Sequence, residues 1–153
     1  MDLILWRHAE AEEGVEGGND LERALTLRGE KQAVRMANWL DRQLPEGARV
    51  LVSPAHRCEQ TVLALGRKYK LRAELAPGGT PAELLELVKW PAGKSTVVVV
   101  GHQPVLGQTI AQLLGLRESD CAVKKGAVWW LRCRIRDGQT QTAVIAVQSP
   151  EAL

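Results

Sequence analysis

The sequence predicts an α/β fold with three layers, in which helices cover both faces of a mostly parallel central sheet. Short apolar runs alternate with amphipathic stretches, a pattern typical of parallel strands joined by helices. The run from Ser95 to Val100 contains four consecutive valines, and such a β-branched run without a polar face indicates a central strand buried on both sides. The last two predicted strands follow each other directly, which adds an antiparallel edge to the sheet.

The first third of the chain predicts one strand, one loop and one helix. Leu3–Trp6 is a short apolar run that indicates a buried strand. Residues 9–25 are acidic and rich in glycine, so we expect a solvated loop there. Thr26 is a good N-cap for a helix over residues 27–44, which Pro45 ends.

A second strand is predicted over Arg49–Val52, and a polar turn follows it. Ser53 as N-cap and Pro54 as first helical residue predict a helix that continues to Tyr69. Residues 71–75 are then expected to form a third strand.

The second half of the chain repeats this alternation. Helices are predicted over residues 80–88 and 104–114, on either side of the valine strand at 95–100. Strands over residues 128–135 and 142–147 flank an Asp-Gly turn, which is a strong hairpin signal.

Size and composition limit the possible function classes. The chain has 153 residues, and we expect residues 1–153 to form a single domain. Its 45% hydrophobic and 25% charged residues are near the globular average and argue against intrinsic disorder. The net charge of +2 is too small to indicate binding to nucleic acid or to a membrane.

The location of the protein is predicted from what the sequence lacks. It contains no apolar run long enough to span a membrane, and its N-terminus does not resemble a secretory signal. The cysteines Cys58, Cys121 and Cys133 are widely spaced and odd in number, which favours reduced thiols. We therefore expect a cytoplasmic protein, which we take to be a monomer.

Polar side chains follow three of the predicted strands at the point where each strand ends. Arg7 and His8 follow the first strand, Ser53 and Arg57 follow the second, and His102 follows the valine strand. In open α/β sheets, ligands bind just beyond these carboxyl ends. Arginine grips phosphate with two parallel hydrogen bonds, and helix N-termini also favour anions. The residues alone therefore predict a site for phosphate or another oxyanion.

Other kinds of site fit less well. His8 and His102 could bind zinc, but a zinc site needs three or four ligands, and two arginines in the same pocket would oppose a cation. We therefore expect no metal. The chain has neither a P-loop nor a G-x-G-x-x-G motif, and Ser53 before proline is not a nucleophile elbow. His56, the third histidine, is expected to be exposed.

Four segments resemble motifs of the histidine phosphatase superfamily, which has the phosphoglycerate mutase-like fold. Residues 5–10 (LWRHAE) resemble its R-H-G signature, and residues 53–61 (SPAHRCEQT) resemble its S-P-x-x-R-x-x-Q-T segment. Residues 101–104 (GHQP) are similar to its second histidine motif. Residues 20–29 (DLERALTLRG) are similar to a D-x-x-R-P-L-T-x-x-G stretch that, with the short chain, points to the SixA-type branch.

The resemblance implies a role for each polar residue at the strand ends. His8 would be the nucleophile that accepts the phosphoryl group, and Arg7 and Arg57 would clamp its oxygens. His102 would hydrogen-bond to the same group, and no metal or cofactor would be needed. The side chains expected to contact the substrate are Arg7, Arg57, His102, Arg23 and Ser53.

Two departures from the family pattern stand out. Ala9 replaces the usual glycine after the nucleophile, and we expect it to be tolerated because alanine needs only a negative φ. Related phosphomonoesterases use a Glu or Asp to protonate the leaving oxygen. Glu83 is the candidate in the corresponding region, with Glu10 and Glu12 as alternatives.

The branch implies a phosphatase that acts on phosphohistidine in a partner protein, such as a phosphorelay domain. The alternatives are a small-molecule phosphomonoesterase and a catalytically idle phosphate-binding module. Only 17 residues separate His8 from Thr26 and 44 separate Arg57 from His102, so neither interval can hold a folded cap. We therefore expect an open pocket, which suits a phosphorylated side chain on another protein.

Overall fold

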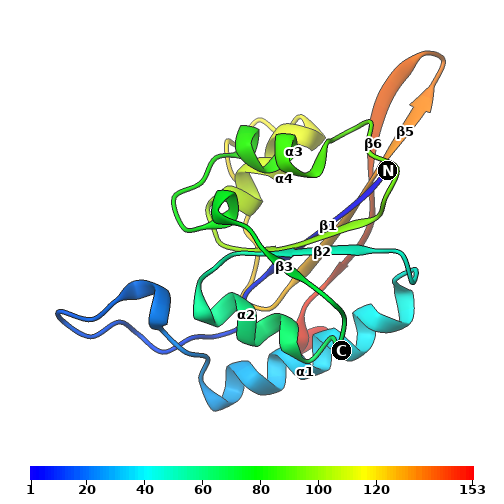
Figure 1. The fold of residues 1–153 in the computed structure, drawn as a ribbon. Helices are drawn as coiled ribbons and strands as arrows, with labels where there is room; N and C mark the ends of the chain where they lie inside the picture. Colours follow the sequence, from blue (N-terminus) through cyan, green and yellow to red (C-terminus); the bar gives the residue numbers. More distant parts are fainter.

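The computed structural model describes all residues from Met1 to Leu153. Four helices and six strands alternate as the sequence predicts (Figure 1). The helices are α1 (Leu27–Gln43), α2 (His56–Leu63), α3 (Pro81–Val88) and α4 (Val105–Leu114). The strands are β1 (Asp2–Arg7), β2 (Arg49–Val52), β3 (Lys70–Leu71), β4 (Val97–Gly101), β5 (Val128–Arg136) and β6 (Gln139–Gln148).

The six strands form one sheet in the order β3-β2-β4-β1-β5-β6. The pairs β3–β2, β2–β4 and β4–β1 are parallel, whereas β5 runs antiparallel to both β1 and β6. Parallel neighbours need crossover helices, which explains why α1 to α4 connect β1 to β5. The antiparallel edge is therefore confirmed.

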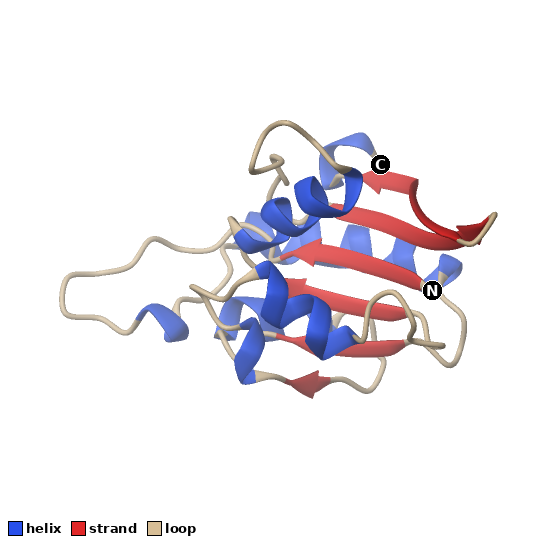
Figure 2. Cartoon of the chain, turned by 90° about the horizontal axis from the view of Figure 1, so that it is seen from above, coloured by secondary structure: helices blue, strands red, loops and turns tan.

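α1 and α2 cover one face of the sheet and α3 and α4 cover the other, which confirms the three layers (Figures 1 and 2). β4 lies at the centre, and its alternating side chains enter two separate cores. Val98 and Val100 pack in the core with α1 and α2, while Val97 and Val99 pack in the core with α3 and α4. This burial on both sides explains why the strand contains no polar residue.

The β5–β6 hairpin has a two-residue turn at Asp137 and Gly138. Both residues have positive φ, of 52° and 75°, as the turn that matches the twist of paired strands requires. β6 begins at Gln139 rather than at Thr142, because this tight turn lets pairing start at once.

The helix predicted to run from Pro54 to Tyr69 is shorter than expected. α2 begins at His56, with Ala55 as its N-cap, and ends at Leu63. The turn after it includes Gly66, whose φ of +70° is incompatible with a continuing helix.

The predicted strand over residues 71–75 is also wrong in extent. β3 covers only Lys70 and Leu71, and a short 3₁₀ helix follows over Ala73–Leu75. The chain turns because Arg72 donates its N–H to Val52 while its own carbonyl accepts from Leu75. Leu75 is thereby buried in the core beside α3 and α4.

Residues 9–25 form an arm that projects from the body of the molecule (Figures 1 and 2). The two sides of the arm meet in an antiparallel bridge between Ala11 and Leu25. A short 3₁₀ helix, Asp20–Glu22, lies on its returning side and is capped by Asn19. The expected solvated loop therefore has internal structure.

No helix combines the length and apolar composition that a membrane crossing requires.

Candidate active site

The polar residues that follow β1, β2 and β4 converge on one pocket at the carboxyl edge of the sheet. Its volume is about 220 Å³, and its lining contains four cationic side chains and no carboxylate. The lining residues are Arg7, His8, Ala11, Arg23, Arg57, Pro77, His102, Gln103 and Lys125. Such a lining suits an anion and opposes a metal cation.

His8 lies immediately after β1 with its backbone tied on both sides. Its N–H donates to Gly101 of β4, and its carbonyl accepts from Gly126. The ring Nδ1 lies 2.7 Å from the carbonyl oxygen of Ala9 and donates to it, because a carbonyl can only accept. The proton is therefore on Nδ1, and Nε2 carries a free electron pair.

Burial keeps this imidazole neutral. His8 is 8% exposed, and the loss of hydration lowers its pKa from 6.5 to about 4. The hydrogen bond to Ala9 acts in the opposite direction, and the cations of Arg57 and Arg7 lower the pKa further. A neutral histidine with an unprotonated Nε2 is a competent nucleophile at neutral pH.

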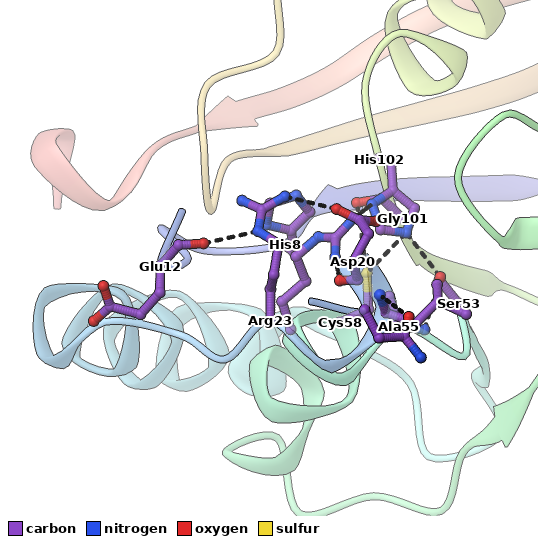
Figure 3. Close-up of polar contacts among 12 residues, drawn as sticks. His8, Glu12, Asp20, Arg23, Ser53, Ala55, Cys58, Gly101 and His102 are labelled. Atoms are coloured by element: carbon purple, nitrogen blue, oxygen red, sulfur yellow. Dashed lines mark hydrogen bonds and ion pairs between the residues drawn. The ribbon is translucent and has the colours of Figure 1, made fainter. Parts of the chain in front are cut away.

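His102 follows β4 and faces His8, with 5.3 Å between the ring centroids. Its Nε2 lies 2.8 Å from the Ser53 hydroxyl, and its Nδ1 lies 3.4 Å from Nη2 of Arg57 (Figure 3). Burial is the main reason that the pKa of His102 falls to about 3, and the proximity of His8 and the charge of Arg57 add to it. Both histidines are therefore neutral in the folded chain near pH 7.

Arg7 and Arg57 are each anchored at one end of the guanidinium. Arg7 donates from Nη1 to the carbonyl of Val123 at 2.7 Å. Arg57 donates from Nη1 to the carbonyl of Asp20 at 2.8 Å and from Nη2 to its carboxylate at 3.1 Å. The Nε–H groups of both arginines are buried without a hydrogen-bond partner within the protein. Buried unpaired donors are costly, so these two groups point to an anionic ligand.

The arm brings a carboxylate beside the pocket that sequence reasoning did not assign to the site. Asp20 accepts from Arg23 at 3.0 Å as well as from Arg57, and Arg23 is held in turn by the carbonyl of Glu12 at 2.8 Å (Figure 3). The hydrogen bond from Arg23 is the largest cause of the lowered pKa of Asp20. The available signal was the D-x-x-R stretch, which contains both residues.

Four lining residues other than arginine and histidine were also missed, namely Ala11, Pro77, Gln103 and Lys125. The side-chain amide of Gln103 donates to the carbonyl of Cys121 and accepts from the N–H of Gly107. Its position directly after His102 could have indicated it. Lys125 and Pro77 come from loops whose sequence carries no motif.

Ser53 is brought to the site but not to its surface. It is completely buried behind His102 and does not line the pocket, so its predicted contact with substrate would require His102 to move. His56 is exposed, as expected. Ala9 is buried and keeps a φ outside the positive region, and its N–H donates to Thr61. Alanine is therefore accommodated after His8.

None of the three candidate acids lines the pocket. Glu83 is exposed, and its carboxylate accepts from the backbone and hydroxyl of Thr80 in a capping box at the start of α3. Glu10 accepts from the hydroxyl of Thr26 at the start of α1. Glu12 contributes its carbonyl to Arg23. The carboxylates of Glu83 and Glu10 are thus engaged by threonines at the starts of α3 and α1, outside the pocket lining.

Known proteins are similar to this chain in sequence. A model of the histidine phosphatase superfamily (branch 1) matches residues 3–78, which include His8 and Arg57. The phosphohistidine phosphatase SixA of Escherichia coli K12 is 36% identical over 121 residues, covering 74% of each protein. The SixA homolog of Haemophilus influenzae is 32% identical over 133 residues, covering 76% of this chain and 79% of that protein.

Solved structures extend the similarity to the whole fold. The protein histidine phosphatase SixA complexed with tungstate matches with a TM-score of 0.77 at 29% identity, covering 98% of this chain and 97% of that one. The chain therefore belongs to the histidine phosphatase superfamily, a family of phosphatases with the phosphoglycerate mutase-like fold. Within it, the relatives are of the SixA type, as the motifs predicted.

Proposed function

We propose that the chain hydrolyses phosphohistidine on a partner protein through a covalent intermediate on His8, without a metal. The observation that supports this most directly is the hydrogen bond from Nδ1 of His8 to Ala9. It leaves Nε2 unprotonated in a pocket that Arg7, Arg57 and His102 also line. The relatives named phosphohistidine phosphatase supply the class of substrate.

The first step is attack by Nε2 of His8 on the phosphorus atom. The new N–P bond forms as the N–P bond of the substrate breaks, and the released imidazole takes a proton from solvent water. Water then attacks the phosphorus on His8 and loses a proton to the solvent, which releases inorganic phosphate and restores the neutral ring. Phosphoryl transfer spreads negative charge over three oxygens, so fixed cations and positioning supply most of the catalysis.

The arginines take the place that a metal ion has in other phosphoryl-transfer enzymes. Arg7 and Arg57 both line the pocket, and the buried Nε–H group of each has no partner within the protein. Such a donor can form a hydrogen bond with a phosphoryl oxygen. We expect turnover to persist in the presence of a chelator and vanadate to inhibit it as a mimic of five-coordinate phosphorus. Loss of activity in EDTA, restored by a divalent ion, would contradict this.

The small size of the pocket favours a phosphorylated side chain as the substrate. Sites for small molecules usually have about 300–1,000 Å³ and bury most of the ligand. The pocket here, at about 220 Å³, has room for a phosphoryl group and the ring that carries it. We propose that residues 1–153 form one domain without a cap, because the chain between Arg57 and His102 is taken up by the helices and strands of the central fold and the outer part of the arm projects from the body (Figure 2).

The absence of a carboxylic acid from the pocket lining also favours phosphohistidine as the substrate. None of Glu10, Glu12 and Glu83 lines the pocket, so an alkoxide leaving group would receive little help. The imidazole of phosphohistidine is a much better leaving group and needs this acid less. We propose no general acid for this reaction.

Trapping the intermediate tests the nucleophile. Rapid quenching without acid should leave phosphate on His8, and His8→Ala should abolish turnover while the chain still unfolds cooperatively. His56→Ala is the matched control, because His56 is exposed at the start of α2 and does not line the pocket. Phosphate trapped on His102 or on a serine would contradict the assignment.

A side-by-side comparison of substrates tests the specificity. We expect kcat/KM for a phosphohistidine protein to exceed that for sugar phosphates and phosphoglycerates by at least about tenfold, or roughly 1.4 kcal/mol of transition-state preference. Equal or faster turnover of a free phosphometabolite would favour the small-molecule phosphatase. No turnover of either, with phosphate still bound, would indicate an idle binding module.

A further inference from the structure

We propose that Ser53 is a positioning residue that fixes His102 in the tautomer whose Nδ1 carries the proton. A neutral His102 would then donate a hydrogen bond to an oxyanion in the pocket. This proposal rests on the proposed function only in taking an oxyanion as the ligand. It gives Ser53 a role through His102 rather than on the substrate.

The inner nitrogen of His102 is enclosed by two side chains that can donate. Nε2 lies 2.8 Å from Oγ of Ser53 and 3.5 Å from Sγ of Cys58, and both residues are completely buried (Figure 3). Nδ1 is the nitrogen on the other side of the ring, 3.4 Å from Nη2 of Arg57, which lines the pocket. The question is which nitrogen holds the single proton of the neutral ring.

The hydrogen bonds of Ser53 favour a proton on Nδ1. The hydroxyl oxygen already accepts from the N–H of Ala55 at 3.2 Å, so its own hydrogen is free to donate to Nε2. If Nε2 carried the proton instead, both N–H groups would donate to Oγ and the buried Ser53 hydroxyl would need another acceptor. Cys58 stays protonated, because burial raises its thiol pKa to about 12, and its Sγ donates to the carbonyl of Gly101 at 3.9 Å.

The contact between His102 and Arg57 favours the other tautomer, because a guanidinium only donates, but it is the weaker of the two contacts. At 3.4 Å it is close to the outer limit for a hydrogen bond, whereas the Ser53 contact at 2.8 Å is short. With the proton on Nδ1, the N–H groups of His102 and Arg57 become neighbouring donors to a shared acceptor. A phosphoryl oxygen supplies such an acceptor.

The two histidines would then use the same tautomer for opposite purposes. In His8, the Nδ1 proton is held by the carbonyl of Ala9, which leaves the electron pair of Nε2 for attack. In His102, Nε2 is held by Ser53, which leaves the Nδ1 proton for donation. One ring presents an acceptor and the other a donor across 5.3 Å between their centroids.

Nitrogen-15 NMR of the imidazole groups tests the tautomer directly. The chain has three histidines, and His56→Gln simplifies the spectrum by removing the exposed one. We expect wild-type His102 near pH 7 to show a protonated Nδ1 and an unprotonated Nε2, both without ligand and with vanadate. A protonated Nε2 with an unprotonated Nδ1 in the presence of vanadate would overturn the proposal.

Variants of Ser53 connect the tautomer to ligand binding. Ser53→Ala should shift His102 toward the Nε2–H form and weaken vanadate binding by about 10²-fold, the usual loss for one oxyanion donor. Ser53→Cys keeps a donor and should recover part of the affinity. Thr109→Val removes another completely buried hydroxyl, which bonds to Val105 within α4, and controls for loss of stability alone.

Each result has a definite meaning. The proposal would be overturned if the Ser53→Ala variant stays folded, keeps His102 in the Nδ1–H form and binds vanadate like the wild type. Equal weakening by Thr109→Val would also overturn it, because the effect would then be one of stability. Both readouts are independent of phosphohistidine turnover, so a failure of the proposed function would appear separately in the trapping experiment.

Discussion

Arg7 and Arg57 show how single residues prepare this site for an anion. In each guanidinium, protein oxygens hold Nη1, and Nε–H remains buried and unpaired. The Nε–H and one Nη2–H of a guanidinium project from the same edge, which matches two oxygens of a phosphate. Anchoring one end of each fork therefore orients its other edge before the ligand arrives, which reduces the entropy lost on binding.

Replacing Arg57 tests whether its guanidinium holds the ligand with two parallel donors. Arg57→Ala should weaken vanadate binding and slow transfer together, because it removes a charge-assisted contact of about 2–3 kcal/mol. Arg57→Lys should recover only part of the loss, since an ammonium lacks the planar pair of donors. Steady-state kinetics and vanadate titration measure both effects.

Arg67→Lys is a suitable control for that substitution. Arg67 lies beyond the other end of α2, where it donates to Asp41 and to carbonyls after α1, so its loss should leave vanadate affinity unchanged. Full activity of Arg57→Lys would argue against a bidentate clamp.

The depressed pKa of His8 predicts where activity is lost in acid. The attacking ring must be unprotonated, and burial places its pKa at about 4 rather than 6.5. After correction for ionisation of the substrate, kcat/KM for an aryl phosphate should hold down to about pH 5 and fall as the pH passes through about 4. An acid limb near pH 6.5 would show that His8 is more hydrated than the structure indicates.

At the scale of elements, the start of α1 is fitted closely to the arm that contributes to the pocket. Thr26 caps the helix by accepting from Gly29, and its own N–H donates to the carbonyl of Glu10. A Cβ on Gly29 would lie 2.0 Å from that carbonyl oxygen. The helix therefore needs glycine here for close approach of two backbones.

This contact makes Gly29→Ala a test of the packing. Although alanine favours helices, the forced displacement of Glu10 should lower the free energy of unfolding by about 1–3 kcal/mol. Gly47→Ala meets nothing within 4 Å and should change it by less than about 0.5 kcal/mol. Urea denaturation compares the two, and equal stability of both variants would contradict the close approach.

At the scale of the whole molecule, the buried histidines make stability depend on pH. His8 and His102 have folded pKa values of about 4 and about 3, below the 6.5 of an unfolded chain. Between those values the unfolded chain binds more protons, so stability must fall as the pH decreases below about 6.5. The lowered pKa values of Asp2 and Asp20 add to this loss at more acidic pH.

Calorimetry at several pH values tests this linkage. The Tm should decrease from pH 7 to pH 4.5, and His8→Asn should reduce the slope because asparagine does not titrate. The exposed His56 provides the control, since His56→Asn should leave the slope unchanged. A wild-type Tm that does not vary over this range would contradict the buried, neutral state of both rings.

Much of this protein could be predicted from local sequence alone. The order of elements, the valine strand β4 and the Asp-Gly hairpin follow from periodicity and turn chemistry, which depend on neighbouring residues. Arg7, His8, Arg57 and His102 were identified because each follows a predicted strand, and parallel strands bring their carboxyl ends to the same edge. Their convergence in one pocket is observed, while their catalytic roles remain predictions.

Other features were decided only by contacts between distant residues. Glu10 is a possible acid in sequence, but its carboxylate accepts from the hydroxyl of Thr26 at the start of α1. Ser53 follows a strand like the other site residues, yet it lies behind His102. Asp20 reaches Arg57 only because the arm folds back on itself, and Lys125 reaches the pocket on a loop without a motif. Side-chain partners of this kind depend on three-dimensional proximity, which local periodicity does not encode.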